Sequence, residues 1–230
     1  MSRRIVVAID GPGGAGKSTV ARGLAGRLGF LYIDTGAMYR AVALWARRQG
    51  IGWDNVQALE EMAKAADIAL ESNPPKVTLN GEDVTAAIRE PEISQGASKV
   101  SAVGGVRRAL VEKQREMARS FSVVMEGRDI GTVVFPGAEV KIFLDAEPDV
   151  RARRRVKELG EKTPPPPPEE RVLAELEERD RRDRGRTESP LLQAPDAVYL
   201  DSSGLTVDQV EEAILRLIRE RTSNGKELQR

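Results

Sequence analysis

The stretch Gly11-Pro12-Gly13-Gly14-Ala15-Gly16-Lys17-Ser18 follows an apolar run at residues 5–9 and precedes a helical pattern that begins near Thr19. It fits the spacing GxxxxGK[ST] of a phosphate-binding loop between a strand and a helix. Glycines let successive backbone N–H groups point at one anion, and the following helix N-terminus adds partial positive charge. Lys17 is then placed to reach the β- and γ-phosphates of a nucleotide, and the Ser18 hydroxyl to hold Mg²⁺. The alternative is a glycine-rich turn that binds no nucleotide.

Composition limits the kinds of protein that this chain can be. Its 230 residues are 40% hydrophobic and 31% charged, which is enough for one sizeable core and too polar for a membrane protein. Lys plus Arg and Asp plus Glu total 36 each, so net charge indicates neither nucleic acid nor a membrane surface as partner. The chain has no Cys and no His, and it therefore lacks thiolate and imidazole catalysis. That composition suits phosphoryl transfer, in which positioning and charge neutralisation provide most of the rate.

Short apolar runs recur along the chain, and polar residues follow them. Besides residues 5–9, such runs occur at 30–33, 122–125, 141–144 and 197–200, which predicts an α/β protein with five strands. Ligands of open α/β sheets gather at the carboxyl ends of the strands, so Thr35, Tyr39 and Arg40 lie where a substrate would bind. The segment 126–129 follows the third run in the same way. Core packing for Tyr39 and solvation for Arg40 are the alternatives. Asp145, after the fourth run, is interpreted as a helix cap, with a partner of Mg²⁺ or water as the alternative.

Residues 68–88 interrupt the alternation of strands and helices. Asn80-Gly81 stands between alternating residues, and both positions of a type I′ turn require positive φ. We interpret this segment as a small antiparallel insertion on the substrate side, with an ordinary surface hairpin as the alternative. Further helices are predicted over 19–28, 37–49, 92–120 and 207–218, and from a cap at Asp54 to residue 66. The pattern over 92–120 is interrupted at 104–105, between Ser98 and Arg107.

Residues 151–186 are rich in arginine. Six side chains fall on two predicted helix faces, namely Arg151, Arg154 and Arg155 on the first, and Arg179, Asp183 and Arg186 on the second. Five prolines at 164–168 separate the two helices and predict a short extended connection. The pattern fits a hinged lid over phosphates and equally a solvated hairpin of ion pairs, because acidic residues alternate with the arginines.

Five segments identify a family resemblance. They are GPGGAGKST, DTGAMYR, EGRDIGTVVFP at 126–136, KIFLDA at 141–146 and RDRRDRGR at 179–186. In this order they resemble the bacterial cytidylate kinases over about residues 4–220. The resemblance implies a P-loop three-layer α/β fold with a five-stranded parallel sheet, in one kinase domain over 1–220. It also implies an antiparallel NMP-binding insertion at about 66–100 and a helical lid at about 151–186.

The activity implied by the resemblance is transfer of the γ-phosphate of ATP to CMP or dCMP with Mg²⁺. No apolar run approaches the ~20 residues of a membrane span, and a strand follows Met1 almost directly, without room for a signal peptide. We therefore expect a cytoplasmic protein that binds neither nucleic acid nor membranes. We also expect a monomer and a disordered tail at 221–230.

The resemblance also assigns site residues. Those expected to bind ATP are Gly11, Pro12, Gly13, Gly14, Ala15, Gly16, Lys17, Ser18 and Thr19. Those expected to bind the acceptor nucleotide are Thr35, Tyr39, Arg40, Ser98, Arg107, Arg128, Asp129, Arg179, Asp183 and Arg186. Lys17, Arg128, Arg154 and Arg155 are the expected catalytic residues, with Arg151 beside them in the lid, and Ser18 is the expected metal ligand. At Asp129 a carboxylate accepts a hydrogen bond from the amino group of cytosine, whereas uracil presents a carbonyl there.

Two other classes of function remain as alternatives. A P-loop kinase for another small acceptor, such as a different nucleotide or shikimate, would share the donor loop. A nucleotide-dependent switch would bind ATP or GTP without rapid acceptor-dependent turnover. The chain has no guanine-binding NKxD tetrapeptide, whereas arginines recur at the ends of the predicted strands.

Overall fold

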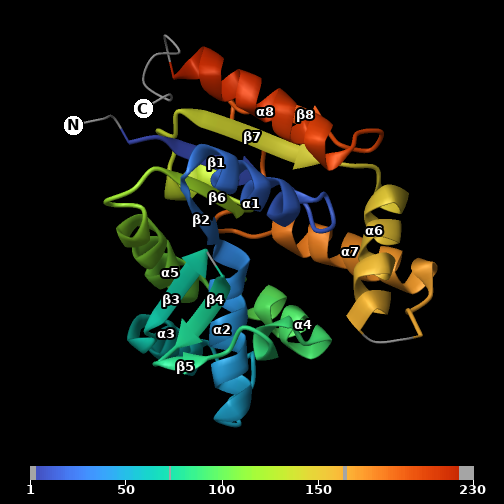
Figure 1. The fold of residues 1–230 in the computed structure, drawn as a ribbon. Coiled ribbons are helices and arrows are strands. Elements are labelled where there is room, and N and C mark those ends of the chain that lie inside the picture. The colour runs from blue at the N-terminus through green and yellow to red at the C-terminus, as the bar shows by residue number, and fades with distance from the viewer. Residues whose placement is uncertain (1–3, 73, 163–164, 223–230) are drawn as a thin grey trace.

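Five parallel strands form the centre of the computed structural model, which describes residues 4–72, 74–162 and 165–222 (Figure 1). They are β1 (Val6–Asp10), β2 (Leu31–Asp34), β6 (Val123–Gly127), β7 (Val140–Asp145) and β8 (Val198–Asp201). Their order is β2-β6-β1-β7-β8, and every neighbouring pair is parallel. The predicted five-stranded parallel sheet is confirmed. Because β1 is central, the glycine-rich loop that follows it leaves from the middle of the carboxyl edge.

Helices cover both faces of this sheet. The long helices α1 (Lys17–Leu28) and α8 (Val207–Arg221) lie on one face, where Ile9 and Ile142 pack in their cluster. On the other face, Met125 packs with side chains of α5 (Gly104–Met117) and of the π-turn η2 (Ile130–Val134). Successive residues of a strand point to opposite faces, which is why a run of buried apolar residues serves both layers. The predicted three-layer architecture is confirmed.

A second lobe follows β2 and contains the antiparallel strands β3 (Ile68–Ser72), β4 (Pro75–Leu79) and β5 (Glu82–Asp83). Asn80 and Gly81 join the last two with φ of 51° and 84°, the positive values that the turn requires. The antiparallel insertion is therefore confirmed.

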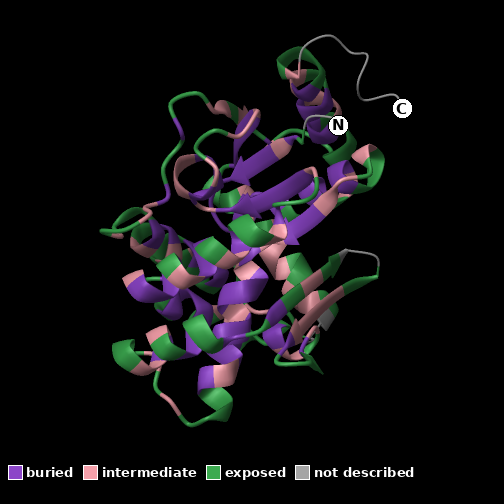
Figure 2. Cartoon of the chain, turned by 90° about the vertical axis from the view of Figure 1, so that its left-hand side faces the viewer, coloured by how far each residue is buried: buried purple, intermediate pink, exposed green. Residues whose placement is uncertain are grey.

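Helices complete the second lobe. They are α2 (Thr35–Arg48), α3 (Val56–Ala65), η1 (Ala87–Arg89) and α4 (Pro91–Val100). The interior between them is apolar, and Met38, Leu59 and Ile93 are completely buried there. Figure 2 shows that buried residues line the inner sides of the elements, whereas exposed residues lie on the outside.

The arginine-rich segment forms an arm of two helices, α6 (Pro148–Lys162) and α7 (Glu169–Arg184). Ala152, Val172 and Leu176 are buried between them. Residues 165–168 are not helical, as the prolines predict, whereas Pro164 lies outside the described residues. Among the described residues, no helix combines the length and apolarity needed to cross a membrane.

Several predicted boundaries are wrong by one to three residues. Asn55, not Asp54, caps α3 by accepting a hydrogen bond from the Ala58 N–H at 3.2 Å, and both residue types make good caps. The helix α2 starts at Thr35, directly after its cap Asp34. Gly185 ends α7, so Arg186 lies beyond the helix face that carries Arg179. At the carboxyl end, α8 still includes Arg221, and the rest of the expected tail after residue 222 lies outside the described residues. Whether residues 1–220 act as one domain remains a prediction.

Candidate active site

The glycine-rich loop has a backbone that only glycine adopts easily. Gly11, Gly14 and Gly16 have φ of 147°, 79° and 91°. A Cβ at Gly11 would overlap the Leu144 carbonyl on β7, and one at Gly14 would meet Arg151 on α6 at 3.0 Å. The loop thus packs closely between β7 and the arm and ends at the N-terminus of α1. This arrangement fits a bound phosphate chain.

Lys17 is buried within this loop, with only 5% of its surface exposed. Its Nζ donates a hydrogen bond to the Pro12 carbonyl at 2.6 Å. Burial and the nearby charge of Arg128 lower the pKa of Lys17 to about 7. A phosphate at the loop would stabilise the ammonium form, so the site is suited to an anion.

A carboxylate near the carboxyl end of β6 lies beside the loop. Glu126, on β6, accepts hydrogen bonds from the Ser18 hydroxyl and from the Tyr32 hydroxyl, the latter at 2.6 Å. Burial and the charge of Asp34 raise the pKa of Glu126. A serine hydroxyl beside a carboxylate is a suitable set of oxygen donors for Mg²⁺, which takes few protein ligands and keeps several waters. Within the described ranges, no cluster of three or more His, Cys, Asp or Glu residues is suited to a metal.

Asp10 fixes the turn that carries the predicted base-binding residue. Its two oxygens accept hydrogen bonds from the Ile130 and Gly131 N–H groups at 2.8 and 2.7 Å. Burial raises the pKa of Asp10 to about 6, although these two hydrogen bonds oppose the rise. The turn that begins at Asp129 is thereby held against the end of β1.

Four of the predicted acceptor-binding residues are buried in one polar cluster, which we call the base side of the predicted acceptor pocket. Asp129 forms an ion pair with Arg107, and both side chains are buried. The Arg107 guanidinium lies 5.3 Å from the centre of the Tyr39 ring, and burial raises the pKa of Tyr39 to about 12. Ser98 completes the group, and its Oγ is buried without a partner among the described residues. These residues come from α2, α4, α5 and the turn after β6.

The sugar side of the pocket is built around Asp183, whose side chain is 1% exposed. It accepts a hydrogen bond from Arg128 Nε at 2.9 Å and another from Arg186, and Arg179 lies 4.0 Å away. Burial favours a higher pKa for Asp183, but the three arginine charges outweigh it and hold this pKa below its usual value. Burial and Arg128 lower the pKa of Arg179 to about 10. Three arginines around one carboxylate leave excess positive charge, which suits an anionic ligand.

Thr35 and Arg40 connect this pocket to the end of β2. Thr35 Oγ1 donates to the Glu126 carbonyl at 2.8 Å, and Arg40 pairs with Asp34 at 2.7 Å. Burial favours a higher pKa for Asp34, yet the charge of Arg40 and the Ala37 N–H outweigh it and lower that pKa. The Thr35 hydroxyl is thus engaged with the backbone, and its contact with substrate remains a prediction.

The arginines of α6 lie in three different settings. Arg151 is buried and donates to the Gly13 carbonyl at 3.1 Å and to Asp180 at 2.6 Å, so it ties the arm to the loop. Arg154 donates to the Ser202 hydroxyl at 3.0 Å and its carbonyl at 2.7 Å, and Arg155 pairs with Glu158 at 2.6 Å. Arg154 and Arg155 remain predicted catalytic residues, whereas the contacts of Arg151 are structural.

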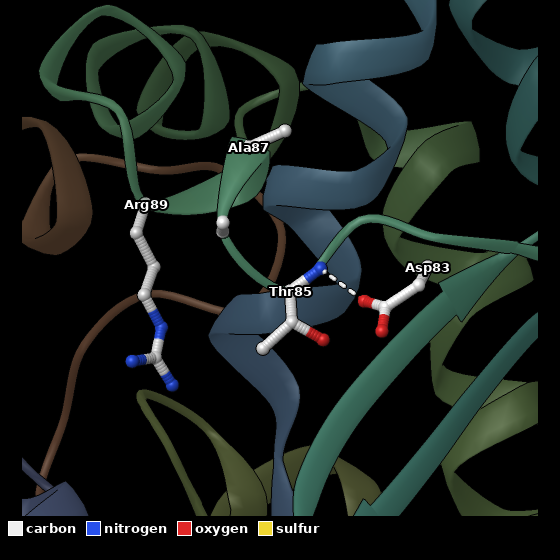
Figure 3. A pocket seen from close by; sticks show the side chains of 5 residues that line it. Asp83, Thr85, Ala87 and Arg89 are labelled. Carbon is white, nitrogen blue, oxygen red and sulfur yellow. Dashed lines mark hydrogen bonds between the residues drawn. The ribbon is translucent and has the colours of Figure 1, made fainter.

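Sequence reasoning missed Asp10, Tyr32 and Ser202 in this site and assigned no role to Glu126. It also missed Gln114, which hydrogen-bonds to Tyr39, and Ser101, which accepts a hydrogen bond from Arg186. The signal for Asp10 was available, since it is a polar residue directly after an apolar strand. A separate depression on the antiparallel lobe is lined by Asp83, Thr85, Ala86, Ala87 and Arg89 (Figure 3). The Arg89 side chain extends away from Asp83 in this view, and its charge also lowers the pKa of Asp34.

A phosphate-binding loop at the centre of a three-layer α/β fold, beside a buried cluster of arginines around Asp129 and Asp183, defines a P-loop kinase. The chain matches the cytidylate kinase family model over residues 7–220, and it belongs to that family. A cytidylate kinase of Solibacter usitatus (strain Ellin6076) is 62% identical over 226 residues, covering 98% of this chain and 97% of that protein. A cytidylate kinase of Desulforamulus reducens (strain ATCC BAA-1160 / DSM 100696 / MI-1) is 51% identical, covering 94% and 97%.

A solved structure shares the fold at low sequence identity. It is an uncharacterized protein from Eubacterium ventriosum ATCC 27560, with a TM-score of 0.53 at 14% identity, and the match covers 96% of this chain and 100% of that one. The likeness at this identity concerns the fold alone.

Proposed function

We propose that this chain transfers the γ-phosphate of ATP to CMP or dCMP, giving ADP and CDP or dCDP. The observation that carries the proposal is the buried Asp129–Arg107 pair, which Ser101 links to Ser98. The Oγ of Ser98 is buried without a partner among the described residues. A buried polar atom without a partner costs about 1–3 kcal/mol, which a bound base would recover. The cytidylate kinases named above support the same assignment.

The donor side is assigned to the loop. Lys17 and the loop N–H groups hold the phosphates of ATP, and the Ser18 hydroxyl with a Glu126 oxygen holds Mg²⁺, directly or through water. Bound Mg²⁺ neutralises charge on the donor phosphates. Tyr32 orients the Glu126 carboxylate through its hydrogen bond.

The acceptor side follows from the charges of the pocket. Arg128 and Arg40 hold the phosphate of the acceptor, because a guanidinium binds two oxygens of one phosphate. Asp129 accepts a hydrogen bond from the cytosine amino group. The attacking atom is an anionic phosphate oxygen, so transfer proceeds in line without a general base or a covalent enzyme intermediate, in keeping with a chain that has no histidine.

The arm is assigned as the lid of the site. Arg154 and Arg155 on α6 neutralise the charge that develops on the transferred phosphoryl group, and closure of the arm limits ATP hydrolysis by excluding water. We further propose that the protein acts as a cytoplasmic monomer without nucleic acid or membrane partners.

A panel of acceptors tests the assignment. ADP formation from ATP and Mg²⁺ is measured with CMP, dCMP, UMP, AMP and shikimate, and the proposal predicts rapid turnover with CMP or dCMP and much slower turnover with the others. Faster turnover with UMP, AMP or shikimate would assign the site to another acceptor. ATP binding without turnover on any of them would favour a nucleotide-dependent switch.

A further inference from the structure

Ser101 lies where the base side and the sugar side of the pocket meet. It follows the last residue of α4 and is 6% exposed. Its hydroxyl donates to the Ser98 carbonyl at 3.0 Å and accepts from Arg186 Nη2 at 2.7 Å. Its carbonyl accepts from Arg107 Nη1 at 3.2 Å. One serine thus contacts three of the residues expected to bind the acceptor.

Arg186 depends on this contact more than the other arginines do. It lies after Gly185, beyond the end of α7, so no helix holds its backbone. Its Nη2 group is shared between Ser101 and Asp183, whereas Nε and Nη1 are buried without a partner among the described residues. Without the Ser101 hydroxyl, Asp183 would be its one remaining hydrogen-bond partner in the described part of the chain. The position of the guanidinium would then depend on that one contact.

The Ser101 hydroxyl both donates and accepts a hydrogen bond. A serine hydroxyl has a single proton, and here it points to the Ser98 carbonyl, so its oxygen is left to accept from Arg186. The bond from Arg186 joins the end of α4 to a segment 85 positions away, whereas the bond to Ser98 lies within the last turn of α4. The last turn of α4 contains Ser98, and the Ser101 carbonyl that follows it accepts a hydrogen bond from Arg107. A shift of Arg186 therefore reaches the base side as well.

We propose that Ser101 is a positioning residue that sets the affinity for the acceptor nucleotide by holding Arg186 beside Asp183. It touches neither the reacting phosphates nor the loop. The proposal rests on the proposed function, because it concerns the affinity of that same acceptor. Loss of this positioning should therefore change KM for CMP without a matching change in kcat or in KM for ATP.

Substitution of Ser101 separates positioning from a merely structural role. Ser101→Ala should raise KM for CMP by about tenfold, the loss typical of one hydrogen bond to a charged group, with kcat and KM for ATP changed by less than about twofold. Ser101→Thr keeps the hydroxyl and should recover most of the affinity. Ser94→Ala, at a half-buried position earlier in the same helix, is the matched control and should behave like the wild type. CMP binding measured by calorimetry without ATP should weaken by the same factor.

A double-mutant cycle with Arg186→Ala provides the decisive readout. If Ser101 acts through Arg186, adding Ser101→Ala to Arg186→Ala should change KM for CMP by less than about twofold. Independent, additive effects would overturn the proposal, and so would an unchanged KM for CMP or an equal rise in KM for ATP. Failure of the proposed function itself looks different, because the wild-type protein would then show no CMP-dependent turnover.

Discussion

Replacing Asp129 with asparagine changes the hydrogen-bonding groups offered to the base with little change in size. The carboxylate only accepts hydrogen bonds, whereas the asparagine amide also donates them and can face the carbonyl of uracil. We expect the ratio of kcat/KM for CMP to that for UMP to fall by about 10- to 100-fold. This range corresponds to about 1.4–2.8 kcal/mol, the size of one hydrogen bond to a charged group.

The same substitution removes the partner of a buried charge. Arg107 is 3% exposed and would lose its ionic partner, so we expect the free energy of unfolding to fall by about 3 kcal/mol. Urea unfolding measures this loss, and ADP formation with CMP and UMP is measured well below the unfolding transition. Glu188→Gln is the control, because its pairing with Arg108 is exposed and contributes under about 1 kcal/mol. A CMP-to-UMP ratio within about twofold of the wild type would remove Asp129 from base discrimination.

Four further predictions follow from the loop and its surroundings. Lys17→Ala should abolish turnover with an unchanged circular dichroism spectrum, and near-normal ADP formation would contradict its assigned role. In the free protein the pKa of Lys17 is about 7, and a bound phosphate raises it, so ATP binding at pH 8 should take up close to one proton. Calorimetry in two buffers of different ionisation enthalpy measures that uptake, and equal heats in both would refute it. Arg151→Met leaves Asp180 buried without its ion pair, so the free energy of unfolding, measured in urea, should fall by about 3 kcal/mol. A fall below about 1 kcal/mol would mean that the Arg151–Asp180 ion pair contributes little to stability. Tyr32→Phe removes the hydrogen bond to Glu126, so the Mg²⁺ concentration needed for half-maximal activity should rise by about tenfold. Mn²⁺ binding in titrations should weaken by the same factor. Unchanged metal affinity would argue against Glu126 as a ligand.

The parts of the fold that depend on local sequence were predictable. Short apolar runs in the sequence predict the strands of the sheet. The turn at Asn80-Gly81 requires backbone angles that this dipeptide adopts readily. The loop at residues 11–18 combines a motif with its strand and helix context. Where two neighbouring residues are equally suitable, as at Asp54 and Asn55, local preference cannot choose the helix cap.

The contacts that complete the site depend on residues far apart in the chain. Tyr32 and Glu126 are separated by 94 positions, and Asp10 bonds to a turn 120 positions away. No local pattern marks such partners. The position of Arg151 shows the same limit, because helical spacing groups it with Arg154 and Arg155, whereas the packing of the arm turns it toward the loop. Ser101 resembles any other serine at a helix end until Arg186 is placed against it.

The central claim is that this pocket holds a cytosine nucleotide in line with the phosphates of ATP. Phosphorus NMR of the protein with ATP, Mg²⁺ and CMP tests it most directly, since it identifies where the transferred group goes. We predict that the γ-phosphate signal of ATP is lost as the β-phosphate signal of CDP appears, with no matching growth of inorganic phosphate. Unchanged CMP, or ATP converted only to ADP and inorganic phosphate, would contradict the assignment.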